Sequence, residues 1–258
     1  MTYALITGAS KGIGYAIAEE LASRKINVIL IARSEDLLQK AATKIADEYK
    51  VQAAYLAIDL TETNAAQTII DWCNQKKYTI NILVNNAGYG LSGAFENYPL
   101  AAHTNMMQLN MHVPVALIYL LLPQLKQQQS FIMNIASGAS YQAVPGLNVY
   151  AASKAFILSF SRGLRYELKN SSVSVTAVSP GATETDFPNR AKVDSPKAKK
   201  MAKQFNMQPK QVATIAVNGL FAKKPEVVTG FVNKLAVFFA WLLPKSFLEK
   251  SAASIYDL

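Results

Sequence analysis

Tyr150 and Lys154 stand four residues apart in the string Tyr150-Ala151-Ala152-Ser153-Lys154. On a helix this spacing puts the lysine ammonium beside the tyrosine phenol, where the positive charge favours the ionised phenol. Such a phenol can exchange a proton with an oxygen atom of a substrate. Ser137 follows a preceding predicted strand, and its hydroxyl is expected to hydrogen-bond the same oxygen. Taken alone, a Tyr–Lys pair on a helix is more often a surface contact.

A second string, Thr7-Gly8-Ala9-Ser10-Lys11-Gly12-Ile13-Gly14, has the composition of a phosphate-binding turn. Glycines close a tight turn and let the main chain approach a pyrophosphate, and the following helix N-terminus favours its charge. A plain strand-to-helix turn is the alternative. Together with the Tyr–Lys pair, the string predicts a chain that binds a nicotinamide cofactor and protonates what its hydride attacks. Cofactor contacts are expected from Gly8, Ser10, Lys11, Gly12, Ile13 and Gly14.

The end of the second predicted strand, Ile31-Ala32-Arg33, indicates which nicotinamide cofactor is bound. An acidic residue there would hydrogen-bond the free 2′-hydroxyl of NAD, but Arg33 takes this place. Its guanidinium can pair with a 2′-phosphate, and Lys11 adds a second cation. The sequence therefore favours NADP over NAD. Extension of Arg33 into solvent is the alternative.

Further cofactor contacts are expected where other strands end, because ligands bind at the carboxyl edge of a parallel sheet. Asp59 and Leu60 follow the third strand, although Asp59 can equally be a turn or capping residue. The small residues in Asn85–Gly88 permit a close approach to a ligand. Asn110 is an amide within an apolar helical stretch and needs a polar partner, such as a water or a carbonyl in an active site.

The elements that must position these residues alternate between apolar strands and longer helices. Strands are predicted at 3–7, 27–32, 51–58, 82–85, 131–135, 173–178 and 226–229. Helices are predicted at 13–25, 34–48, 63–75, 101–122, 150–169 and 208–223. This alternation predicts an α/β fold, a Rossmann-type doubly wound parallel β-sheet flanked by helices on both faces.

Length and charge limit the remaining possibilities. A chain of 258 residues can bury one large core, so a single dinucleotide-binding and catalytic domain over 1–258 is expected. Lys and Arg outnumber Asp and Glu by 26 to 17, and lysines crowd residues 192–210. That stretch is either a solvated mobile segment or part of a substrate lid over about 181–206. The charge comes without aromatic interleaving or a nucleic-acid-binding motif, so nucleic acid is not an expected partner.

The C-terminal tail, about 231–258, contains nine uncharged residues at Leu235–Leu243. They are too few to span a bilayer as a helix. Such a segment is more commonly buried in the core or in a subunit interface. It could instead roof the substrate pocket or make peripheral membrane contact. Trp241 and the flanking lysines favour membrane contact. Cys73 is the one cysteine and no secretory signal precedes the first strand, so a cytoplasmic location is expected, with membrane association through the tail as a variant.

These residues together resemble the short-chain dehydrogenase/reductase family over almost the whole chain. Thr7–Gly14 is similar to the family's cofactor turn and Asn85–Gly88 to its fourth-strand motif. The family's four catalytic positions match Asn110, Ser137, Tyr150 and Lys154 in the same order.

The resemblance implies a role for each of several further residues. Asp59 would meet the adenine. Asn86, with Ala87 and Gly88, would meet the cofactor ribose region. Asn110 would hold a water that relays protons from Lys154. Lys154 would also hold the nicotinamide ribose. The segment after the sixth strand would contact the nicotinamide carboxamide through Pro180, Gly181, Thr183 and Thr185.

The sequence as a whole predicts an NADP(H)-dependent oxidoreductase that interconverts a ketone or aldehyde and an alcohol by hydride transfer, with Tyr150 as general acid/base and no metal. A non-catalytic NADP-binding sensor or scaffold of the same fold is the alternative. Subunit association is expected, because helices 101–122 and 150–169 carry more apolar surface than one sheet face needs, and the family resemblance implies a homodimer or homotetramer. A hydrophobic substrate is favoured by the apolar residues expected to line its pocket, Leu91, Phe95, Val144, Leu147 and Phe187.

Overall fold

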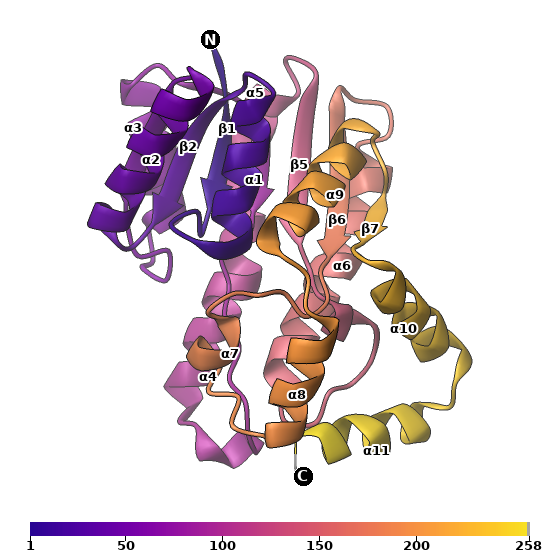
Figure 1. The fold of residues 1–258 in the computed structure, drawn as a ribbon. Helices are drawn as coiled ribbons and strands as arrows, with labels where there is room; N and C mark the ends of the chain where they lie inside the picture. The colour runs from indigo at the N-terminus through magenta and orange to yellow at the C-terminus, as the bar shows by residue number, and fades with distance from the viewer. Residues whose placement is uncertain (257–258) are drawn as a thin grey trace.

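Seven parallel strands form one sheet in the order β3-β2-β1-β4-β5-β6-β7 (Figure 1). The computed structural model describes residues 1–256, except for the side chains of 201–203, so the last two residues of the predicted tail lie outside the described residues. The strands are β1 Thr2–Thr7, β2 Asn27–Ala32, β3 Ala53–Ala57, β4 Thr79–Asn85, β5 Ser130–Ile135, β6 Val173–Ser179 and β7 Glu226–Val228. The predicted fold class, a doubly wound parallel sheet, is confirmed.

Helices cover both faces of the sheet, and alternate residues of each strand divide between them. Ala4 and Ile6 of β1 pack in one core with α1, α2 and α9, whereas Tyr3 and Leu5 pack in a second core with α3, α5 and α6. Parallel strands buried on both faces are apolar throughout. The helices that cover the sheet are α1 Gly12–Ser23, α2 Glu35–Tyr49, α3 Ala65–Gln75, α5 Val113–Leu125, α6 Asn148–Glu167 and α9 Pro209–Phe221.

The long helix predicted at 101–122 is interrupted. It consists of α4, Leu100–Met107, a π-helical turn at Gln108–His112, and α5. A π turn adds a residue to one turn of helix and is often found at functional sites; Asn110 is its central residue. Within the described residues one helical run, Leu100–Leu125, suits a membrane span by length and composition alone, and 39% of its 18-residue window is buried in the protein.

The segments after β6 contain helices that the sequence did not predict. Residues 181–206 contain α7, Phe187–Arg190, and α8, Pro196–Phe205. After β7 the chain forms α10, Phe231–Leu242, and α11, Lys245–Ile255, an arm beside the body in yellow tones (Figure 1). Ser195 Oγ, at the start of α8, donates to the Ile255 carbonyl at 2.6 Å, so lid and tail are packed together below the sheet. Two short 3₁₀ turns, Phe95–Asn97 and Gly138–Tyr141, complete the elements.

Candidate active site

A cleft of about 1360 Å³ lies at the carboxyl edge of the sheet, between the strand ends above and the lid and tail below. Its wall brings together residues that are far apart in the sequence, from the glycine turn to α10. Of the predicted site residues, the cleft is lined by Gly8, Ser10, Lys11, Gly12, Ile13, Arg33, Asp59, Leu60, Asn86, Ala87, Gly88, Ser137, Tyr150, Lys154, Pro180, Gly181, Thr183 and Thr185. Gly14 and Asn110 lie behind this wall.

The glycine turn is held against β4 by the Asn86 side chain. Asn86 Nδ2 donates to the Thr7 carbonyl at 2.9 Å and to the Gly8 carbonyl at 3.2 Å. A Cβ at Gly8 would come within 2.8 Å of that nitrogen, and one at Gly14 would collide with it. Gly8 also has a φ of +65°, where side chains are strained. These two glycines are therefore required by the packing of the turn itself.

The N-terminus of α1 provides an anion-binding site in the cleft. Its first turn contains no acidic residue, and Lys11, which precedes the helix in extended conformation, does not cap it with its side chain. The main-chain N–H groups of a first helical turn have no partner within the helix, and the helix dipole favours negative charge there. Ser10, Lys11, Gly12 and Ile13 all line the cleft, so the turn fits the pyrophosphate of a dinucleotide.

Arg33 and Asp59 form the far end of the cleft, beyond β2 and β3. Asp59 Oδ1 accepts from the Thr61 amide at 2.9 Å and from the Thr61 hydroxyl at 2.8 Å, and its other oxygen lies 3.8 Å from Arg33 Nη1. These contacts, the Thr61 amide first, hold the pKa of Asp59 below its usual value against the opposing effect of burial. The Arg33 side chain is 70% exposed, and among the described residues this long ion pair is its one polar contact, so its guanidinium has further donors available.

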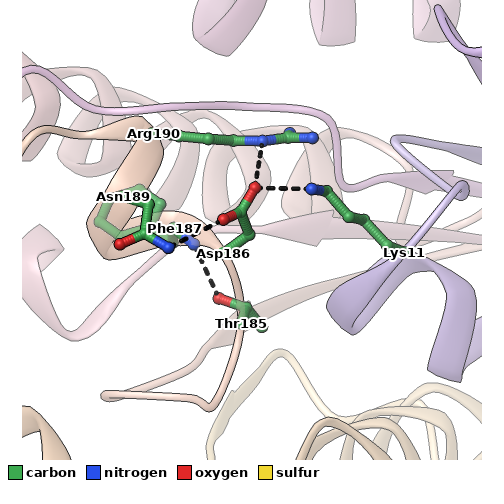
Figure 2. Close-up of polar contacts among 6 residues, drawn as sticks. All are labelled: Lys11, Thr185, Asp186, Phe187, Asn189 and Arg190. Atoms are coloured by element: carbon green, nitrogen blue, oxygen red, sulfur yellow. Dashed lines mark hydrogen bonds and ion pairs between the residues drawn. The ribbon is translucent and has the colours of Figure 1, made fainter.

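Lys11 is engaged by the lid (Figure 2). Its ammonium lies 2.6 Å from Asp186 Oδ2, and Arg190 Nε lies 3.3 Å from the same oxygen. Asn189 donates to the other Asp186 oxygen at 3.1 Å. The hydrogen bond from Lys11 is the main reason that the pKa of Asp186 is lowered to about 2. Asp186 thus ties the lid to the glycine turn, a role that sequence reasoning missed because the two residues are 175 positions apart.

Tyr150 is buried at the start of α6, with the Phe187 ring of the lid 5.2 Å from its own ring. Burial raises the pKa of Tyr150, and a hydrogen bond with Ser137 partly opposes this. Ser137 is itself fixed: its hydroxyl accepts from the Ala139 amide at 3.1 Å, and its own amide donates to the Ser140 hydroxyl at 3.1 Å. The phenol and the serine hydroxyl therefore meet at one point of the cleft.

Lys154 does not lower the pKa of Tyr150 in this structure, contrary to the expectation from their spacing. Its ammonium donates to the Ile135 carbonyl, at the end of β5, at 2.8 Å and lies 5.9 Å from the centre of the Tyr150 ring. The side chain extends toward the sheet instead of along the helix face. Burial lowers the pKa of Lys154 to about 8. The cation is held in the site at a cost in desolvation free energy.

Asn110 connects the strand-four loop to α6. Its Nδ2 donates to the Tyr89 carbonyl and to Ser153 Oγ, both at 3.0 Å, and its Oδ1 accepts from the Tyr89 amide at 3.2 Å. Ser153 Oγ in turn donates to the Tyr150 carbonyl at 2.7 Å. The π turn directs Asn110 inward, behind Gly88. Ser153 and Tyr89 were missed as positioning residues, although Ser153 stands inside the Tyr–Lys string.

The apolar end of the cleft differs from its predicted lining. Leu147 and Phe187 line it, whereas Leu91 and Val144 pack in a cluster behind Tyr150. Phe95 is exposed and stacks on His103, with 4.7 Å between ring centres. The remaining apolar wall comes from α10 and α11, through Ala236, Val237, Ala240 and Tyr256. The tail therefore roofs the pocket, one of the alternatives that the sequence left open.

Comparisons with known proteins place this chain among oxidoreductases. A model of the short chain dehydrogenase family matches residues 2–196. An uncharacterized oxidoreductase of Staphylococcus saprophyticus is 34% identical over 235 residues, 91% of this chain and 95% of that protein. The human inactive hydroxysteroid dehydrogenase-like protein 1 is 34% identical over 181 residues, 69% of this chain and 54% of that protein. The structure of a short-chain dehydrogenase from Sphingobium yanoikuyae in complex with NADPH superposes with a TM-score of 0.82 at 30% identity, covering 90% of this chain and 89% of that one.

Replacing Lys154 with methionine is expected to raise the free energy of unfolding at pH 7. Burial lowers the pKa of Lys154 from 10.5 to about 8, so between these pH values the unfolded chain binds more protons than the folded chain. Below pH 8 the folded protein therefore bears the full free-energy cost of the buried charge. At about 1.4 kcal/mol per pKa unit the gain is about 3.5 kcal/mol, and the lost bond to the Ile135 carbonyl reduces it by about 1 kcal/mol. Urea unfolding at pH 7 and pH 10 measures it.

The gain should nearly vanish at pH 10, where Lys154 of the folded wild type is already neutral. Lys40, an exposed residue of α2, gives a matched control, since Lys40→Met removes the same charge from the surface. A loss of stability at pH 7 in Lys154→Met, or an equal gain at both pH values, would contradict the prediction.

Proposed function

The chain belongs to the short-chain dehydrogenase family, and on that basis we propose that it is an NADP(H)-dependent oxidoreductase interconverting a ketone or aldehyde and an alcohol. The proposal is carried by one observation: Tyr150, Ser137 and Lys154 meet in the same cleft as the glycine turn and Arg33. A bound nicotinamide supplies or accepts the hydride. The protein supplies orientation and the proton.

Tyr150 is the proposed general acid/base. With its pKa raised above the ordinary value of a tyrosine, the phenol is protonated at neutral pH, the state needed to donate a proton to the alkoxide that forms during carbonyl reduction. Ser137 hydrogen-bonds the same oxygen and stabilises the developing charge. Lys154 is proposed to hold the cofactor ribose, with its ammonium kept in the cleft by the bond to the Ile135 carbonyl. Asn110 keeps these groups aligned through Ser153 and, as proposed from the family, relays protons by a water.

NADP is the proposed cofactor in preference to NAD. Arg33 presents an exposed guanidinium at the end of β2, and Lys11 provides a second cation in the glycine turn. The relative from Sphingobium yanoikuyae was solved with NADPH, which supports a nicotinamide cofactor in general. The adenine is proposed to lie against Asp59 and Leu60, and the carboxamide against the segment from Pro180 to Thr185.

A non-catalytic NADP-binding protein is the second candidate function. It is favoured by the name of the human relative, which calls that protein inactive. Against it stands the complete set of Ser137, Tyr150 and Lys154 in this chain.

We propose a single domain with residues 181–206 as the substrate lid, acting in the cytoplasm as a homodimer or homotetramer. Tyr119 on α5 and Phe156 and Tyr166 on α6 are exposed aromatic residues on the helices expected to associate. A hydrophobic substrate is supported by the apolar roof from α10 and α11, and the same tail is proposed to make peripheral membrane contact.

Tyr150→Phe is expected to lower the rate of NADPH consumption with ketones by about 10²- to 10⁴-fold, because the general acid is lost while the ring still packs. A panel of ketones and aldehydes measured by NADPH absorbance tests it. Tyr98→Phe is the matched control, since the Tyr98 hydroxyl donates to the Ser92 carbonyl at 2.8 Å away from the cleft wall. If the cofactor-bound wild type turns over nothing, or Tyr150→Phe is as fast as wild type, the non-catalytic candidate stands instead.

Arg33→Ala is expected to weaken NADPH binding by about 10- to 100-fold and to leave NADH binding nearly unchanged, because only NADPH carries the phosphate that the guanidinium pairs with. Titration calorimetry with both nucleotides measures the ratio. Arg162→Ala removes an exposed arginine of α6 and controls for the general loss of charge. Equal losses for the two nucleotides in Arg33→Ala would show that Arg33 does not select the cofactor.

Asp186→Asn is expected to tighten NADPH binding a few-fold, because it releases Lys11 for the 2′-phosphate; exposed ion pairs have modest energies. NADH binding should stay the same. Asp194→Asn removes a neighbouring lid carboxylate that lies 3.7 Å from Lys199 and leaves Lys11 untouched. The prediction fails if the two variants have the same affinity for NADPH.

A further inference from the structure

The outer side of α10 is an apolar surface whose large side chains are exposed in the described chain, and Trp241 is the most exposed of them at 80%. These residues lie beyond the family match, which ends at residue 196. The exposed stripe consists of Phe231, Val232, Leu235, Phe238, Phe239 and Leu242.

The stripe occupies one face of the helix. Its members follow the spacing i, i+1, i+4, i+7, i+8 and i+11, which keeps side chains within one arc of a helix. The opposite face, with Asn233, Val237 and Ala240, lines the cleft. The helix therefore has the substrate pocket on one side and an uncovered apolar surface on the other.

Lysines accompany the stripe along the arm. Residues 231–256 contain Lys234, Lys245 and Lys250 against a single acidic residue, Glu249. The basic lid helix α8 meets the far end of the arm, at the end of α11, where Lys197 Nζ donates to the Ser254 carbonyl at 3.2 Å. The whole chain has a formal charge of +9. An apolar stripe with basic neighbours and an exposed tryptophan has the composition of a helix that lies at a lipid–water interface.

We propose that the α10 stripe docks on the surface of an anionic phospholipid bilayer, and that the cleft takes its carbonyl or alcohol substrate from that bilayer. At about 1.5 Å per residue the twelve residues of α10 are too short to cross a membrane, so the helix lies in the interface. The substrate part of the proposal rests on the proposed oxidoreductase function. The docking part does not.

A second copy of this chain is a less suitable occupant. A two-fold contact pairs a surface with itself, so Lys234 at the stripe's edge and its copy would be brought toward each other. Anionic headgroups instead gain from each lysine near the surface. Charge complementarity therefore favours the bilayer.

Docking would place the lipid phase one helix away from the reacting groups. On the cleft side of α10 the lining residues Ala236, Val237 and Ala240 are apolar and mostly small, and Phe187 of the lid and Tyr256 face the same space. This wall suits an amphiphile with a long apolar body and one carbonyl or hydroxyl. The substrate class is accordingly a membrane-dissolved ketone or secondary alcohol.

Vesicle binding of the full-length protein tests the docking. Trp72→Phe leaves Trp241 as the only tryptophan, so its emission reports on α10, the helix that bears the stripe. Vesicles of phosphatidylcholine with phosphatidylglycerol should shift this emission to the blue and sediment the protein. Binding to phosphatidylcholine alone should be at least about tenfold weaker, because the three lysines then have no anionic partner. An unchanged emission with the protein left in the supernatant would overturn the proposal.

A matched pair of double variants assigns the binding to the stripe. Phe238→Ser with Leu242→Ser should weaken vesicle binding by at least about tenfold through the lost burial of two apolar side chains. Phe95→Ser with Leu100→Ser makes the same two changes at exposed positions near α4, away from the arm, and should leave binding unchanged. Equal effects of the two pairs would overturn the assignment. A different pair of results would also overturn the proposal: the wild type does not bind vesicles, and it forms an oligomer that dissociates only in the stripe variant. A second copy of the chain would then cover the stripe.

The substrate part is tested with two ketones and NADPH. The stripe variant should reduce a short water-soluble ketone at the wild-type rate and a long-chain ketone dissolved in vesicles at least about tenfold more slowly, in line with its weaker binding. Equal rates for wild type and variant on the vesicle-bound ketone would overturn entry from the bilayer. If the wild type reduces neither ketone while still binding vesicles, the proposed function fails and the docking stands.

Discussion

Burial of both sheet faces is the constraint on which the rest of the structure depends. Because α1, α2 and α9 cover one face and α3, α5 and α6 the other, most side chains on the faces are apolar, and polar residues of the cleft lie where the strands end. The end of each strand from β1 to β6 contributes to the cleft. Asn86 secures this arrangement by bonding the glycine turn to the loop after β4.

The same burial sets the electrostatics of the reacting groups. Tyr150 and Lys154 are removed from water, so the phenol is held protonated and the ammonium is destabilised. The Ile135 carbonyl holds the Lys154 ammonium in this buried position, and the hydrogen bond between Asn110 and Ser153 holds the start of α6, which bears Tyr150.

The lower half of the cleft is built from segments that pack on one another more than on the sheet. The lid is tied to the glycine turn by Asp186 and to the tail by Ser195. The glycine turn, the segment after β6 and the C-terminal helices are thus joined through direct polar contacts.

The sequence by itself determined the fold class, the order of the strands and helices, and the residues at the strand ends, because these follow from hydrophobic periodicity and from glycine-rich turns that are local. It did not determine the π turn at Asn110, the partner of Lys11, the direction of Lys154 or the pocket wall made by α10. Each of these depends on contacts between residues distant in the chain. Tertiary packing alone decides that the buried Lys154 ammonium reaches the Ile135 carbonyl and that the exposed Lys11 ammonium meets Asp186. The free energy of such contacts depends on geometry that no local sequence pattern encodes.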